Sequence, residues 1–92
     1  MDAEKNRCLI ELRRVRALVE RELELADEGQ SDKSPFQLRQ ILKELSTMER
    51  VQAKSEFMPY YPRAIVDSWD LDDPLGRELC GLATLYYTVM RG

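Results

Sequence analysis

The chain has 92 residues, of which 43% are hydrophobic and 34% are charged, and its net charge is −3. This length predicts one small domain with a thin core, which leaves little room for a deep catalytic pocket. The composition is too apolar for a disordered segment, and no apolar run approaches the roughly 20 residues that cross a bilayer. The acidic balance argues against a nucleic-acid-binding protein, which usually carries a basic face.

The sequence contains no histidine, and its cysteines, Cys8 and Cys80, belong to no CxxC pair. Histidine is the commonest general base and a frequent metal ligand, so we expect no enzyme and no metal or cofactor site. The first residues are charged and lack the apolar centre of a signal peptide, which predicts a cytoplasmic protein. Two free, buried thiols are then the expected state, and a Cys8–Cys80 disulfide is the less favoured alternative.

Residues 3–28 are predicted to form one long helix, because apolar residues recur at spacings of three and four. Gly29 is well placed to end this helix. The stripe consists of Cys8, Leu12, Val15, Val19, Leu23 and Ala26, and Leu18 and Leu25 widen it.

The second half of this helix is rich in acids, which oppose the helix dipole there. The acids are Glu20, Glu22, Glu24, Asp27 and Glu28. We expect Arg16 to pair with Glu20, and Arg21 with Glu24. Glu24 is a candidate contact for a basic partner, and a solvated acidic face is the simpler interpretation.

A second helix is predicted from Pro35 to about Lys54, with Ser34 as its N-cap and Gln37 as the returning partner of a capping box. A short connection to the first helix predicts an antiparallel hairpin. The apolar stripe consists of Leu38, Ile41, Leu42, Leu45, Met48 and Val51. The basic residues of this helix are the one candidate phosphate-binding stripe, namely Arg39, Lys43, Arg50 and Lys54.

A short helix over residues 61–69 and a last helix beginning at Pro74, with Asp73 as its N-cap, complete the predicted elements. We expect Ile65, Val66 and Trp69 to share one face of the short helix. The stripe of the last helix consists of Leu75, Leu79, Leu82, Ala83, Tyr86, Val89 and Met90. The predicted fold is therefore all-α: a long antiparallel helical hairpin closed by a short helix and a C-terminal helix, in a three- to four-helix bundle.

Candidate contact residues gather in residues 57–76, which hold four of the seven aromatic residues and three of the four prolines. Rigid aromatic rings beside carboxylates are typical of protein-binding surfaces. The candidates are Tyr60, Tyr61, Trp69, Asp67 and Asp70. Alternatively, one tyrosine packs on the hairpin and the tryptophan closes the core. The aspartates do not have the spacing of a calcium-binding loop.

Tyr60-Tyr61-Pro62, an acidic run, and then Asp73-Pro74-Leu75-Gly76 resemble the second half of colicin-DNase immunity proteins over about a fifth of the chain. Those proteins are small acidic four-helix domains that inhibit a nuclease, and the resemblance implies that Tyr60 and Tyr61 contact the partner.

We therefore expect a non-enzymatic protein-binding module, such as an immunity-type inhibitor or antitoxin, with a second and basic protein as its partner. A structural or regulatory homodimer is the first alternative, and a nucleic-acid-associated regulator that uses the second helix is the other.

Overall fold

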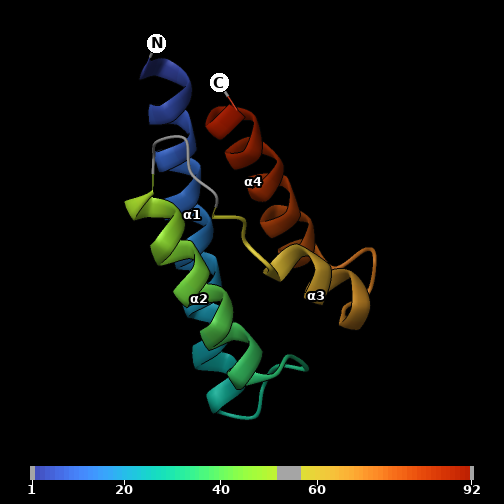
Figure 1. The fold of residues 1–92 in the computed structure, drawn as a ribbon. Coiled ribbons are helices and arrows are strands. Elements are labelled where there is room, and N and C mark those ends of the chain that lie inside the picture. Colours follow the sequence, from blue (N-terminus) through green and yellow to red (C-terminus); the bar gives the residue numbers. More distant parts are fainter. Residues whose placement is uncertain (1, 52–56, 92) are drawn as a thin grey trace.

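The computed structural model describes residues 2–51 and 57–91, and its elements are all helices. They are α1 (Asp2–Asp27), α2 (Pro35–Arg50), α3 (Tyr61–Ser68) and α4 (Pro74–Arg91). In Figure 1, α1 and α2 lie side by side in opposite directions, α4 lies along α1, and the short α3 connects the α2 side to the start of α4. The all-α prediction is confirmed, and the four helices form an elongated bundle of 43 × 22 × 21 Å.

The core forms where the apolar stripes of the helices pack against one another. Side chains from all four helices are buried in one cluster, which explains why helices with little intrinsic stability hold together. The buried residues are Cys8, Leu12, Val15 and Val19 of α1, Leu38, Ile41, Leu45 and Met48 of α2, Tyr61 and Ile65 of α3, and Leu79, Leu82, Ala83, Tyr86 and Val89 of α4. Cys8 is buried and Cys80 is half-buried, and both are free thiols.

The helix ends follow local capping rules. Gly29 has a φ of 75°, the left-handed conformation that ends α1 and that glycine adopts without strain. The Ser34 side chain accepts a hydrogen bond from the backbone N–H of Gln37, which confirms the predicted cap of α2. α2 ends at Arg50, with Val51 as its non-helical C-cap, so the helix is shorter than the predicted one; Lys54 itself lies outside the described residues.

Three sequence-based expectations are wrong in detail. The Gln37 side chain does not return to Ser34, because it contacts Ser68 and Trp69 instead. Val66 is exposed, because the residues of α3 that face the core are Tyr61 and Ile65, four positions apart. Trp69 does not share a helix face with Ile65, because α3 ends at Ser68 and Trp69 follows in extended conformation.

The Arg16–Glu20 pair is also not formed. Arg16 forms its ion pair with Glu49 of α2, which Arg13 also contacts. The hydrogen bond from Arg16 has the largest effect on Glu49, and together with that from Arg13 it holds the pKa of this carboxyl below its usual value. The two arginines therefore join α1 to α2 rather than neutralising acids of their own helix.

Candidate protein-binding site

The two predicted tyrosines lie on opposite sides of the chain. Tyr61 is 3% exposed, and its hydroxyl donates a hydrogen bond to the Leu79 carbonyl at 2.9 Å. Burial raises the pKa of this phenol above its usual value. Tyr60 is 66% exposed, so it alone of the pair presents its ring to a partner.

Glu44 of α2 fixes the position of this tyrosine pair. Its carboxylate oxygen Oε1 accepts hydrogen bonds from the backbone N–H groups of Tyr60 and Tyr61, each at 2.8 Å. No side chain of the preceding residues caps α3, so Glu44 satisfies the free N–H groups of its first turn from a neighbouring helix.

Trp69 closes the end of the bundle at which α3 passes into α4. Its indole N–H donates to the side-chain oxygen of Gln37 at 3.0 Å, and its half-buried ring packs against the core. The Lys33 ammonium lies 4.9 Å from the ring centroid, which is a cation–π distance. The core-closing interpretation of Trp69 therefore describes its position.

Lys33 and Asp73 form an ion pair of 2.6 Å, and their side chains are only 10% and 15% exposed. The other Asp73 oxygen accepts the backbone N–H of Gly76 at 2.8 Å, so the predicted cap of α4 is present. Burial disfavours both charges, yet the hydrogen bonds and the charge attraction together outweigh it, so the pKa of Lys33 is raised and that of Asp73 is lowered. This pair joins the α1–α2 connection to the start of α4.

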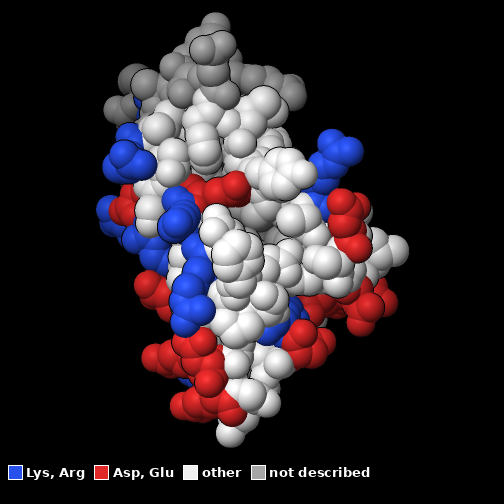
Figure 2. Space-filling view, turned by 60° about the horizontal axis from the view of Figure 1, so that its bottom comes forward, with Lys and Arg blue, Asp and Glu red and all other residues white. Residues whose placement is uncertain are grey.

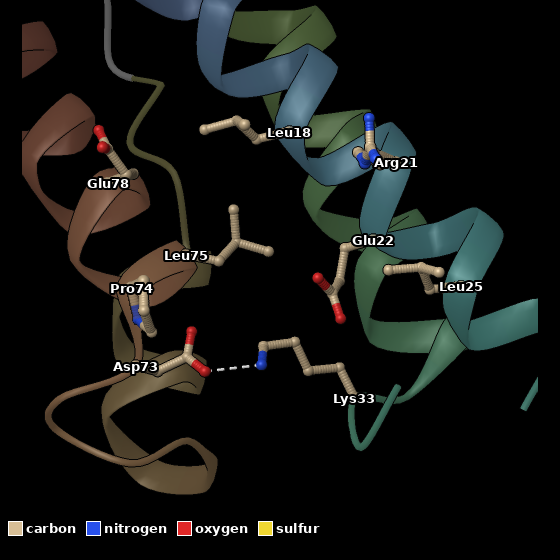
Figure 3. A pocket seen from close by; sticks show the side chains of 9 residues that line it. All are labelled: Leu18, Arg21, Glu22, Leu25, Lys33, Asp73, Pro74, Leu75 and Glu78. Atoms are coloured by element: carbon tan, nitrogen blue, oxygen red, sulfur yellow. Dashed lines mark hydrogen bonds and ion pairs between the residues drawn. The ribbon is translucent and has the colours of Figure 1, made fainter. Parts of the chain in front are cut away.

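An open groove of about 350 Å³ lies between α1 and the start of α4, next to this ion pair. We call it the α1–α4 groove. It is lined by Leu18, Arg21, Glu22, Leu25, Lys33, Asp73, Pro74, Leu75 and Glu78. Figure 3 shows Leu18 and Leu75 directed into the gap from opposite helices, with the Lys33–Asp73 pair at one end.

Acidic residues surround this end of the molecule. Residues 20–28 and 67–78 each contain five acids and one arginine, and the α1–α4 groove lies between the two segments. In Figure 2, acidic side chains gather at the lower left and right of the face, on both sides of an uncharged strip.

Half of these ten carboxylates are exposed and unpaired. Glu20, Glu24, Glu28, Asp67 and Asp70 are exposed and form no ion pair with any described residue. Other members have partners: Asp27 binds Arg39 at 3.0 Å, and Glu78 binds Arg14 at 2.6 Å. Three predicted contact residues, Glu24, Asp67 and Asp70, thus belong to one acidic end, although none of them lines the groove itself.

A second groove, of about 320 Å³, separates α2 from α3. Its apolar surface includes the exposed rings of Phe36 and Tyr60, and Glu44 contributes a carboxylate that is already bound by two N–H groups. The basic stripe of α2 runs beside it, but Arg39 is engaged by Asp27 and Arg50 by Thr47. Lys54 of that stripe lies outside the described residues.

Sequence reasoning missed Lys33, Gln37 and Glu44 as the residues that position this region. Each is a polar residue whose partner lies far away in the chain, and no periodic pattern marks such a residue. Leu18 and Leu75 belong to the apolar stripes of the first and last helices. Leu18 lies at the edge of its stripe, and an apolar residue in that position is the one sequence signal for a groove.

Among the described residues, no three His, Cys, Asp or Glu side chains come together to hold a metal ion. None of the helices described combines the length and the apolar character required to span a membrane. Comparisons with protein-family models, with curated proteins and with solved structures find no match for this chain.

Proposed function

We propose that this protein is a small non-enzymatic protein-binding module whose acidic end recognises a basic protein. One observation carries the proposal: two acid-rich segments, far apart in the sequence, meet at one end of the bundle, and five of their ten carboxylates are exposed and form no ion pair with any described residue. Such a concentration of like charge opposes folding, and the five unpaired acids have no compensating ion pair among the described residues. A partner of opposite charge supplies that compensation.

The same surface suits inhibition of a nuclease or another nucleic-acid-binding protein. Such proteins bind phosphates through clustered lysine and arginine side chains. A rigid acidic surface competes for those side chains and attracts the basic protein over a distance, which increases the association rate. The resemblance to colicin-DNase immunity proteins points to the same use, with the difference that Tyr61 is buried here and leaves Tyr60 as the exposed tyrosine.

The proposal is tested by charge reversal on one helix. Glu20→Lys, Glu24→Lys and Glu28→Lys are combined in a single variant, because these three side chains are exposed, with Glu20 and Glu24 one turn apart on α1 and Glu28 directly after its end. Glu4→Lys is the matched control, since Glu4 is an exposed acid on the same helix near its other end. Melting curves of both variants confirm that the fold is retained.

The immobilised proteins are then used to capture partners from an extract of the native host, and the product of the neighbouring gene is tested first. We expect a basic protein to bind the wild type and the Glu4→Lys control but not the triple variant. With the purified partner, the dissociation constant should rise steeply with salt. Equal retention by all three proteins, or a salt-independent affinity, would contradict the proposal.

A further inference from the structure

We propose that the α1–α4 groove receives an apolar side chain from a lysine- or arginine-flanked segment of the partner. The inference rests on the proposed function, because it assumes that the acidic end binds a basic protein. It adds the chemistry of the bound segment and the position of its anchor.

The floor of the groove is apolar and accessible. Leu18 is 37% exposed although it belongs to the apolar side of α1, and Leu75 on the facing helix is half-buried. Leu25 and Pro74 complete this apolar surface. Protein-binding sites commonly combine such an apolar centre with a polar rim.

The size of the groove limits the ligand. A volume of about 350 Å³ lies at the lower end of the range for small-molecule sites, and this groove is open to solvent rather than enclosed. It therefore has room for one or two side chains of a peptide. A partner residue such as leucine, methionine or phenylalanine fits the floor.

The rim selects positive charge on both sides of that anchor. Glu22 on α1 lines one wall, and Glu78 on α4, which is already paired with Arg14, lines the opposite wall. The positive charge is therefore selected mainly by Glu22 and by the exposed, unpaired acids of both segments beyond the groove. The Lys33 ammonium is already neutralised by Asp73 and does not repel a cation at its end of the groove. Acidic segments are excluded by the same carboxylates.

Arg21 is an unpaired positive charge on the rim, so its removal tests the inference by an expected gain of affinity rather than a loss. It lines the groove and forms no ion pair with any described residue. An unpaired guanidinium repels the positive flanks of the proposed segment. Its removal should therefore strengthen binding, whereas loss of the apolar floor should weaken it.

The experiment begins with selection from a display library of random peptides on the immobilised protein. We expect the selected sequences to share an apolar residue flanked by lysine or arginine. One selected peptide is synthesised, titrated into isotope-labelled protein and mapped by amide chemical shifts. The largest shifts should fall on Leu18, Leu25 and Leu75.

The matched variants are Leu18→Ala and Leu75→Ala in the groove, with Ile10→Ala as the control, because Ile10 is an exposed apolar residue of the same α1 outside the groove. Each groove variant should weaken peptide binding by about tenfold or more, and the control by less than about twofold. Arg21→Gln should tighten it by about twofold to fivefold. If Leu75→Ala proves unfolded, Leu18→Ala and Arg21→Gln still decide the question.

The two levels of the proposal fail differently. Binding that is abolished by the acid reversals but unchanged in Leu18→Ala and Arg21→Gln would overturn the groove inference and leave the proposed function standing. Selected peptides that lack basic residues, or shifts centred on Phe36 and Tyr60 in the α2–α3 groove, would also overturn the groove inference. Failure of every basic peptide and protein to bind would remove the proposed function itself.

Discussion

The hairpin of α1 and α2 and the junction at the start of α4 hold the same small bundle together by different means. The hairpin joins two apolar stripes, and their buried side chains belong to one continuous apolar cluster. The junction instead consists of single polar contacts: Lys33 with Asp73, Gln37 with Trp69, and Lys33 over the indole ring.

This difference has a consequence for function. The apolar stripes explain why the chain folds, but the junction determines where the α1–α4 groove lies, because the Lys33–Asp73 pair closes one end of that groove. Substitutions of buried core residues in the hairpin should therefore change stability alone, whereas substitutions at the junction should change both stability and the geometry of the proposed site.

The largest expected effect separates the two neighbouring tyrosines. Tyr61→Ala removes a buried ring and its hydrogen bond to the Leu79 carbonyl, so it should cost about 3–5 kcal/mol of unfolding free energy. Tyr60→Ala removes an exposed ring and should change stability by less than about 0.5 kcal/mol. Urea denaturation of both variants measures the difference, and similar losses would show that Tyr60 also packs on the bundle.

Leu45→Ala tests the hairpin. Leu45 is fully buried between the helices, so the cavity should cost about 2–5 kcal/mol. Because it lies outside the groove, partner affinity at a temperature where the variant is folded should be unchanged. A loss of less than about 0.5 kcal/mol in a denaturant titration would show that the stripes do not carry the stability of the bundle.

The elements that sequence predicted well are those with a repeating signal. The 3.6-residue period located α1, α2 and α4. Side-chain capping located Ser34 and Asp73, and the left-handed conformation that glycine favours located Gly29. Such signals depend on residues only a few positions apart, so they are legible in one sequence.

The site was less predictable, because its geometry depends on pairs that are distant in the chain. Glu44 meets the backbone of Tyr60 and Tyr61, and Lys33 meets Asp73, only after the helices have packed. The acidic half of α1 was recognised as unusual from sequence, but the α1–α4 groove beside it required the placement of α4.

The pH dependence of stability tests the Lys33–Asp73 pair. Since the folded pKa of Asp73 is lowered, the stabilisation is complete above the unfolded pKa of about 3.9 and is lost as the pH falls through the lower folded value. Wild type should lose more stability than Asp73→Asn on acidification below about pH 4, when thermal unfolding is followed against pH.

The raised pKa of Lys33 makes stability fall, rather than rise, as the pH increases in the alkaline range. Its contribution to stability is complete below the unfolded pKa of about 10.4 and is lost as the pH rises through the higher folded value.

At neutral pH, Asp73→Ala removes both the ion pair and the helix cap, so it should lower the free energy of unfolding by about 1–2 kcal/mol. Asp72→Asn is the matched control, since the side chain of Asp72 is 92% exposed, and an equal effect there would assign the loss to general charge.

The smallest expected effect compares two glycines of α4, where the sign rather than the size is informative. A Cβ added at Gly81 meets nothing within 4 Å, so Gly81→Ala should stabilise the helix by about 0.5–1 kcal/mol through propensity alone. A Cβ at Gly76 would lie 3.2 Å from the Trp69 ring and 3.3 Å from Ile65. The ring is held by Gln37 and Lys33 and has little freedom to yield, so Gly76→Ala should destabilise by about 1 kcal/mol.

Thermal melts of the two variants and of Gly76→Ala combined with Trp69→Phe distinguish the causes. A smaller ring should recover part of the loss if the junction is as closely packed as the structure shows. Stabilisation by Gly76→Ala would mean that α3 and α4 can separate at this point, and that the junction does not fix the α1–α4 groove.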